Sequence, residues 1–239
     1  MNTSEKDALR FSQQAEAGCL TYAQAIERYQ RGDHTVSIDE MTGIQALERT
    51  APTKPARPGL VERREFEYIR PGTQTLIANF EVGLGQVLCP SLGDSRTEAD
   101  FVAHIARTVA TDPDAGWTFV LDQLNIHQSF GLVIWVAQQC QLTDALGQKG
   151  KTGILATMAS RAAFLTDPAH RIRFVYTPKH SSWLNQIELW FSILMRRLLK
   201  RASFVSIADL NQRILEFIAF FNRTAKPFKW TYTGRPLCA

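Results

Sequence analysis

One short apolar run, Trp117–Leu121 (WTFVL), constrains the fold of this chain more than any other feature. It has the length of a strand and almost no polar side chains, which is typical of a central strand covered on both faces of a sheet. Asp122 follows directly, so this strand ends in a carboxylate. Apolar and polar residues alternate over Thr35–Asp39, which predicts a second strand with one buried face and with Asp39 on the opposite face.

The rest of the chain predicts a mixed α/β fold in which helices flank the sheet. Hydrophobic periodicity predicts further strands over 73–80, 86–88 and 171–176, the first two as a hairpin. It predicts helices over 4–31, 98–109, 132–141, 182–201 and 207–222, with Ser181 or Ser182 as an N-cap. Prolines and arginines mark 51–72 as a long basic surface loop, and 142–169 receives no predicted structure.

The composition indicates a folded protein inside the cell. The chain has 239 residues, of which 45% are hydrophobic, enough for one full domain or two small ones. No apolar stretch approaches the ~20 residues of a membrane span, and acidic side chains stand where a signal peptide would be apolar. A cytoplasmic location is therefore expected. The scattered cysteines favour reduced thiols over a disulfide framework or a zinc site: Cys19, Cys89, Cys140 and Cys238.

Charge is distributed unevenly along the chain, whose formal net charge is +4. Residues 151–239 carry 14 basic against 4 acidic side chains, whereas residues 1–150 carry 13 against 19. Such a basic C-terminal part favours a polyanionic partner, and nucleic acid is the commonest polyanion in a cell. A surface that is merely soluble is the alternative.

Three acidic residues stand where a buried sheet would not require them. Asp39 and Asp122 end predicted strands, and Glu188 borders the apolar stripe of the predicted helix 182–201. If the two strands are neighbours, the three carboxylates can converge at one edge of the sheet. Clustered carboxylates repel one another unless a cation lies among them, and Mg²⁺ takes carboxylate oxygens. A pair of such ions is suited to phosphodiester cleavage or transfer.

Each of these acids also has an ordinary structural interpretation. An aspartate at the end of a strand often forms a turn or caps a helix. Glu188, at the edge of an apolar stripe, is of the kind that forms a surface ion pair. The metal-site interpretation therefore depends on all three acids together.

Five stretches of the chain carry a family resemblance. They read SIDE at 37–40, GIQALER at 43–49, LDQLNIH at 121–127, YTPKHSSWLNQIE at 176–188 and FNRTAKPFKWTY at 221–232. Over about 33–237 the chain resembles the DDE transposases of bacterial insertion sequences in the mariner-like superfamily, and the fourth stretch is highly specific. The resemblance implies a ribonuclease-H-like domain over 34–239 and carries the family's metal-binding acids onto Asp39, Asp122 and Glu188.

The same resemblance implies a cofactor and partners. Two Mg²⁺ or Mn²⁺ ions would be bound by the three acids. The substrate would be double-stranded DNA, cut at transposon ends and joined to target DNA by the freed 3′-hydroxyl. A homodimer in a synaptic complex is expected, and no membrane partner.

The chain departs from that family's pattern in three places. Gln123 follows the second aspartate, where the family often has Asn. The spacing from Asp122 to Glu188 is longer than in many relatives, so 139–169 resembles an insertion. Residues 1–33 form a short helical segment and are too few for the helix-turn-helix region with which such transposases usually begin.

Polar and basic side chains near the three acids are predicted DNA contacts. Asn125 and His127 follow the second aspartate, and His180 and Asn185 precede Glu188. Helix capping is an equal alternative for Asn125, whereas a packed, hydrogen-bonded position is favoured over DNA contact for His127. For His180 and Asn185 the expected role is either DNA contact or shaping of the site. Four basic side chains are predicted to contact DNA phosphates, with a solvated helix face as the alternative: Arg196, Arg197, Lys200 and Arg201. The arginines of the predicted loop have two interpretations, contact with flanking DNA or ordinary solvation, of which solvation is the safer: Arg57, Arg63, Arg64 and Arg70.

The sequence therefore predicts a transposase catalytic domain, associated with the nucleoid when it is bound to DNA. Two rival functions stay open. One is a structure-selective nuclease on the same fold, which would cut DNA without joining an end into a second duplex. The other is a truncated remnant, which would bind DNA with salt-sensitive affinity and give no nicks with Mn²⁺.

Overall fold

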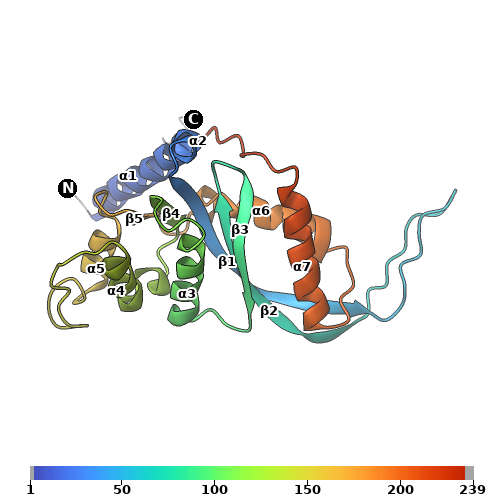
Figure 1. The fold of residues 1–239 in the computed structure, drawn as a ribbon. Helices are drawn as coiled ribbons and strands as arrows, with labels where there is room; N and C mark the ends of the chain where they lie inside the picture. The colour runs from blue at the N-terminus through green and yellow to red at the C-terminus, as the bar shows by residue number, and fades with distance from the viewer. Residues whose placement is uncertain (1–2, 235–239) are drawn as a thin grey trace.

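The computed structural model describes residues 3–234, and it is built around a five-stranded mixed sheet (Figure 1). In the order β3-β2-β1-β4-β5, β2 runs antiparallel to both β3 and β1, and β4 and β5 run parallel to β1. The strands are β1 (His34–Arg49), β2 (Tyr68–Glu81), β3 (Gln86–Gly93), β4 (Trp117–Leu121) and β5 (Ile172–Tyr176). The predicted mixed α/β sheet is confirmed, and the two strands that carry the aspartates are neighbours.

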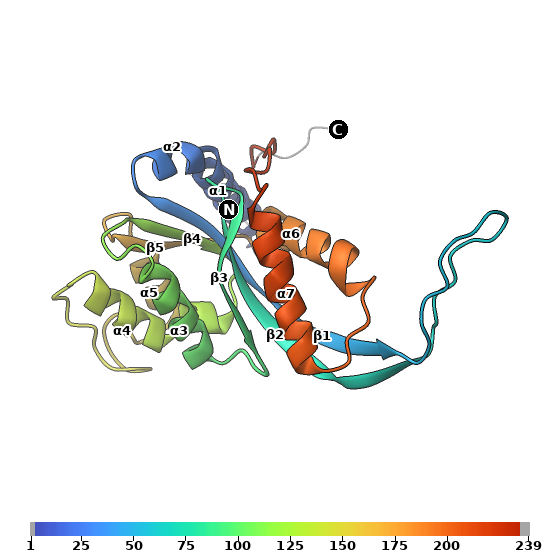
Figure 2. The same ribbon diagram turned by 45° about the vertical axis from the view of Figure 1, so that its right-hand side comes forward.

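Helices cover both faces of the sheet (Figure 2). On one face, α3, α4 and α5 pack in a core that includes Phe101 and Leu132, and on the other face α6 and α7 pack in a core that includes Trp190 and Leu210. The helices are α1 (Thr3–Ala23), α2 (Ala25–Gln30), α3 (Glu98–Val109), α4 (Phe130–Gln139), α5 (Met158–Leu165), α6 (Ile187–Leu194) and α7 (Ile207–Asn222).

β4 is the central strand that its apolar run predicts. All of its residues are buried. Phe119 and Leu121 belong to the core under α3 and α4, whereas Val120 belongs to the core under α6 and α7. Because both faces of β4 are covered, the strand needs apolar side chains at successive positions.

β1 is much longer than the predicted strand, and it extends into a projecting arm. A register shift between Met41 and Ile44 includes Gly43, whose φ of 66° favours glycine. Beyond β1 the arm, residues 50–67, projects away from the sheet (Figure 2). The loop predicted over 51–72 is therefore wrong at its end, because 68–72 pairs with β1. Pro71 is tolerated there because β3 pairs with β2 only from Thr75 onward.

The segment predicted as one helix over 182–201 is divided into three. A 3₁₀ turn (η2, Ser182–Leu184) precedes α6, and a π-helical turn (η3, Met195–Leu199) follows it. Asn185 interrupts the helix because its backbone is extended, with φ −90° and ψ 113°. The serine cap is also wrong, since α6 begins after Gln186 without a side-chain cap. Glu188 consequently lies in the first turn of α6.

The N-terminal segment is helical, as predicted, and packs against the sheet. Tyr22 and Ala25 are buried in the same core as α6 and α7, and Gln123 Nε2 donates to Gln14 Oε1 over 3.2 Å. In the segment without predicted structure, α5 contributes to the opposite core. A domain boundary at residue 33 and an insertion over 139–169 stay predictions.

Two further expectations concern the membrane and the cysteines. Among the helices of residues 3–234, none combines the length and apolar character needed to cross a membrane. Cys19, Cys89 and Cys140 are free thiols, and Cys238 lies outside the described residues.

A histidine holds the start of β1. His34 Nδ1 lies 2.9 Å from Glu81 Oε2, and His34 Nε2 lies 3.2 Å from Asp112 Oδ2. The ring also stacks on Trp117 with centroids 4.0 Å apart. Burial lowers the pKa of His34, but the hydrogen bonds and charges of Glu81 and Asp112 outweigh it and raise the pKa. The fully buried Glu81 side chain needs such a positive partner.

We predict that His34→Phe destabilises the protein by about 3 kcal/mol near pH 6, because the ring still stacks but leaves Glu81 without a cation. The pKa of His34 is higher in the folded than in the unfolded protein. Protonated His34 therefore contributes its full stabilisation of the fold below the unfolded-state pKa of about 6.5, and this contribution is lost as the pH rises through the folded-state pKa. The cost should therefore be smaller at about pH 9. Urea unfolding at both pH values measures it, with the exposed His180→Phe as control. An equal cost at both would contradict a charged His34.

Candidate active site

Asp39 and Asp122 occupy the same level of two adjacent parallel strands. Ser37 of β1 pairs with Val120 of β4, and each aspartate lies two residues further along its chain. Parallel strands end at the same edge of a sheet, so backbone pairing by itself brings the two carboxylates together. Both aspartates are half-buried.

The pKa of Asp39 responds to both of the other predicted acids. Burial raises it most, and the Glu40 backbone N–H, which donates to Asp39 Oδ1 over 2.8 Å, opposes that rise. The negative charges of Asp122, Glu40 and Glu188 raise the pKa of Asp39 further, to about 7. Burial also raises the pKa of Glu188. The three acids predicted from the sequence therefore lie in one electrostatic neighbourhood.

Asn185 ties the start of α6 to β1. Its Nδ2 donates to Ile38 O over 2.9 Å and to Asp39 Oδ2 over 3.2 Å, and its Oδ1 accepts from the Ser37 hydroxyl. The backbone oxygen of Asn185 accepts from the Glu188 N–H over 3.1 Å. One residue thus fixes the segment that carries Asp39 relative to the segment that carries Glu188.

His127 links Asp122 to Glu40. Its Nδ1 lies 2.8 Å from Asp122 Oδ1, and its Nε2 lies 2.9 Å from Glu40 Oε1. Burial lowers the pKa of His127, but the two carboxylates outweigh it and raise the pKa to about 9. For Asp122, burial raises the pKa, yet His127, the Leu124 N–H and the charge of Arg96 lower it below its usual range. Asp122 is therefore kept ionised while Asp39 is pushed toward its neutral form.

Sequence reasoning missed Glu40 and Arg96. The Glu40 side chain is fully buried, and Arg96 Nη1 lies 3.4 Å from Glu40 Oε2. A signal was present, because the alternation of the first strand puts Glu40 on its apolar face, where a carboxylate needs a positive partner. The sequence does not indicate which residues are these partners, because Arg96 and His127 lie 56 and 87 residues from Glu40 along the chain.

Two of the predicted DNA contacts lie inside the protein. His127 is 0% exposed and Asn185 is 1% exposed, so neither side chain offers a surface to DNA. Their prediction as DNA contacts is therefore replaced by a positioning role, because each one holds an acid. The other predicted contacts are exposed: Asn125, His180, Arg196, Arg197, Lys200 and Arg201, with Arg57, Arg63 and Arg64 on the arm and Arg70 on β2.

Hollows flank the acids on two sides. His180 and Lys179 line a hollow that also includes Asp122. Arg196 and Lys200 line another hollow that includes Glu188. Positive side chains therefore accompany the acids on both sides, which suits a polyanion that crosses them.

The three acids are near enough for Asp122 and Glu188 to influence the pKa of Asp39, but they do not form a closed metal cage. Within residues 3–234, no group of three or more Asp, Glu, His or Cys side chains is arranged to hold a metal ion on its own. Mg²⁺ keeps several waters and uses few carboxylates where it also binds phosphates, so a closed cage is not required. The acids fit a divalent cation chemically, because a cation would offset both the burial and the neighbouring negative charges that raise the pKa of Asp39.

The sequence profile of the DDE superfamily endonucleases matches residues 34–211, which include all three acids. The chain belongs to this DDE superfamily. No curated protein sequence matches the chain.

Solved structures of the Mos1 transposase share the fold of this DDE endonuclease. The Mos1 mariner paired-end complex with Mn gives a TM-score of 0.52 at 14% identity, over 87% of this chain and 55% of the Mos1 chain. The Mos1 catalytic domain with raltegravir and Mn gives a TM-score of 0.51 at 12% identity, over 92% of this chain and 84% of the Mos1 chain. A pre-cleavage Mos1 transpososome gives 0.50 at 13% identity, over 87% and 56%.

This likeness confirms the predicted ribonuclease-H-like sheet flanked by helices. The chain spans about half the length of the longer Mos1 chains.

We predict that Mn²⁺ binding releases a proton from Asp39 in weak acid. The pKa of about 7 keeps this carboxyl largely protonated at about pH 6, whereas a metal ion binds the carboxylate. Mn²⁺ affinity should therefore rise with pH up to about 7 and level off above it. Calorimetry in buffers of different ionisation enthalpy counts the protons, and Asp39→Asn should remove the release. Affinity that does not change with pH would contradict this linkage.

We predict that Asn185→Ala weakens Mn²⁺ binding by about 10- to 100-fold, the effect of losing a side chain that orients a metal ligand. Asn125→Ala, at an exposed asparagine, is the matched control and should keep the parental affinity. Thermal unfolding in EDTA reports stability separately. Ser37→Ala removes one contact of Asn185 and gives a milder second variant. Parental Mn²⁺ affinity in both Asn185→Ala and Ser37→Ala would limit Asn185 to a role in the core.

Proposed function

We propose that this DDE endonuclease is a transposase catalytic domain, which cleaves DNA strands and transfers them with metal ions bound by Asp39, Asp122 and Glu188. One observation carries the proposal. Asp39 and Asp122 lie at the same level of parallel strands, and the charge of Glu188 reaches Asp39. When bound, a pair of Mg²⁺ or Mn²⁺ ions supplies Lewis-acid stabilisation of the attacking and leaving oxygens in an in-line displacement.

Residues of the chain prepare these acids in advance. Asn185 holds one carboxylate oxygen of Asp39, and His127 holds one carboxylate oxygen of Asp122. Glu40 and Arg96 in turn hold His127 in place through buried and half-exposed contacts. Ligands fixed by such supporting contacts lose little freedom when a metal ion and a phosphate bind.

The proposed DNA path follows the hollows on both sides of the acids. Lys179 and His180 would contact phosphates on the Asp122 side, and Arg196 and Lys200 would do so on the Glu188 side. Arg197 and Arg201 are exposed on the same segment as this second pair. Basic side chains that neutralise phosphates give affinity without reading sequence.

Transposition would use the same displacement twice. In cleavage, a water oxygen forms a bond to phosphorus while the bond to the 3′ oxygen breaks and leaves a 3′-hydroxyl. In transfer, that 3′-hydroxyl forms the new bond to a target phosphorus while the target strand breaks.

The proposed partners are transposon ends, target DNA and a second copy of the chain. The paired-end architecture named for the Mos1 complexes supports them. The short helical segment before the 34–239 domain would act as part of the same unit, since Tyr22 is buried in its core. A cytoplasmic, nucleoid-associated location accords with this role.

We predict that Asp122→Ala lowers DNA nicking with Mn²⁺ by about 10³-fold, since a metal ligand supports several kcal/mol of transition-state stabilisation. DNA affinity in EDTA should stay nearly unchanged, because phosphate contacts come from basic side chains. The exposed Asp144→Ala is the matched control and should nick like the parent. Gel analysis of nicked plasmid and fluorescence anisotropy make the two measurements. Equal nicking by Asp122→Ala and the parent would remove Asp122 from the site.

Products separate the transposase from its two rivals. A labelled DNA end that becomes joined to a second duplex is the product of strand transfer. Nicks without joined product would identify a nuclease, and binding without nicks would identify a remnant. The substrate should carry the terminal repeats of the element.

A further inference from the structure

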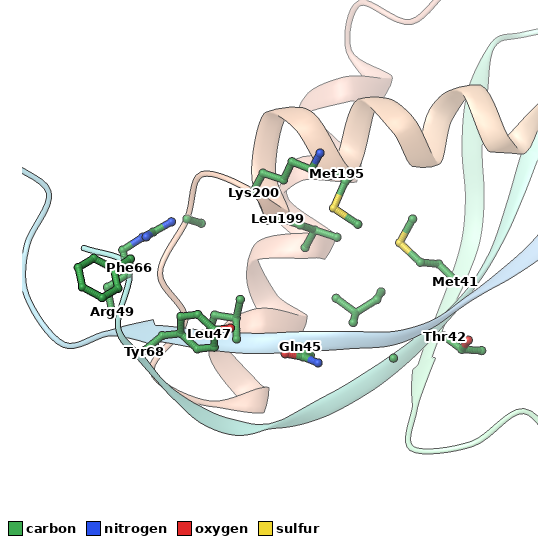
Figure 3. A pocket seen from close by; sticks show the side chains of 13 residues that line it. Met41, Thr42, Gln45, Leu47, Arg49, Phe66, Tyr68, Met195, Leu199 and Lys200 are labelled. Carbon is green, nitrogen blue, oxygen red and sulfur yellow. The ribbon is translucent and has the colours of Figure 1, made fainter. Parts of the chain in front are cut away.

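A second cavity lies between β1, the π-helical turn η3 and the base of the arm (Figure 3). Its volume is about 510 Å³, within the range of ligand pockets. The side chains of Met195 and Leu199 point from the helical turn toward β1, and Tyr68 and Phe66 stand at the arm side (Figure 3). This cavity is distinct from the acids and takes no part in holding them.

The cavity adjoins the hollow that includes Glu188. Met41, Met195 and Lys200 line both this cavity and the hollow that includes Glu188. A strand that lies in the hollow beside Glu188 would therefore have this cavity as a neighbour. The π-helical turn contributes to both, since its Met195 lines the cavity and the hollow, whereas its Leu199 lines the cavity alone.

Its chemistry combines apolar and aromatic walls with a positive rim. None of the 13 described residues that line it is acidic, and Arg49 and Lys200 stand among them (Figure 3). Phe66 is 81% exposed and Tyr68 is 41% exposed, so both rings are open to a ligand. Two methionines add polarisable, adaptable side chains. A planar aromatic group attached to a negatively charged chain matches these walls, and the base of an unpaired nucleotide is such a group.

We propose that this cavity receives an unstacked nucleobase of the DNA strand that passes Glu188. The inference rests on the proposed function, because it takes the ligand to be the same DNA. Tyr68 stacks on the base, Met195 and Leu199 pack around it, and Lys200 holds its phosphate. The substrate class is thereby narrowed to DNA that is unpaired next to the cleaved bond, since a base in a continuous duplex would first have to leave its stack.

The test compares two DNA probes in EDTA, where no cleavage occurs. One is a blunt duplex, and the other is the same duplex with a short thymidine overhang at the 3′ or the 5′ end. The parent should bind the overhang more tightly. Tyr68→Ala removes the stacking ring, and Leu199→Trp fills the cavity. Each variant should reduce the affinity for the overhang probe by about fivefold to a hundredfold. Both variants should bind the blunt duplex like the parent, which also shows that they fold.

Matched controls lie on α7, outside the cavity. Phe220→Ala removes a ring that is 60% exposed, and Leu215→Trp enlarges a leucine that is 45% exposed. Both should keep the parental preference for the overhang. Iodouracil in the overhang should photo-crosslink to Tyr68 or Phe66, which peptide mass spectrometry identifies.

Four results would overturn the inference. If the parent shows no preference for the overhang, or if the variants lose affinity for both probes equally, the cavity does not bind a nucleobase. The proposed function would stand in either case. Variants that convert a dimer to a monomer in sedimentation with unchanged overhang preference would make the cavity an interface between copies. A parent that binds neither probe would overturn the proposed function together with the cavity.

Discussion

The repulsion between carboxylates at the ends of two adjacent strands is the constraint on which this site depends. Asp39 and Asp122 are brought together by the parallel pairing of β1 with β4. That pairing lies between two apolar cores, one under α3 and α4 and the other under α6 and α7, so the strands cannot separate to relieve the repulsion. Burial raises the pKa of Asp39 most, and the charges of Asp122, Glu40 and Glu188 add to that rise. Burial of the sheet thus supplies the free energy that keeps a cation-seeking cluster in place.

Supporting residues treat the two aspartates differently. Asn185, a neutral amide, holds Asp39 and leaves its negative charge uncompensated. His127, which carries a positive charge, compensates Asp122 and Glu40 together. The pKa of Asp122 is therefore held below its usual range, whereas the pKa of Asp39 is raised to about 7. Two like side chains, one beside an amide and one beside an imidazolium, accordingly have unlike pKa values.

The basic surface extends this site in both directions. Lys179 and His180 lie on the Asp122 side, and Arg196 and Lys200 lie on the Glu188 side. The basic surface on the Glu188 side depends on the division of the predicted helix 182–201 into three segments. Extended backbone at Asn185 puts Glu188 in the first turn of α6, and the π-helical turn beyond it carries Met195 to the shared wall of the adjoining cavity. A continuous α-helix would have given neither placement.

The sequence by itself determined the elements whose side-chain pattern is local. The buried strand β4, the helices over 98–109 and 207–222 and the three acids follow from periodicity and from a family resemblance. Tertiary structure alone decided what depends on partners far along the chain. The contacts of Asn185 with β1, the pairing of Glu40 with His127 and Arg96, and the cavity at the base of the arm all join residues separated by long loops. Local propensity reports the conformation of neighbouring residues, whereas a buried charge or amide is satisfied by whichever distant group the packed core brings to it.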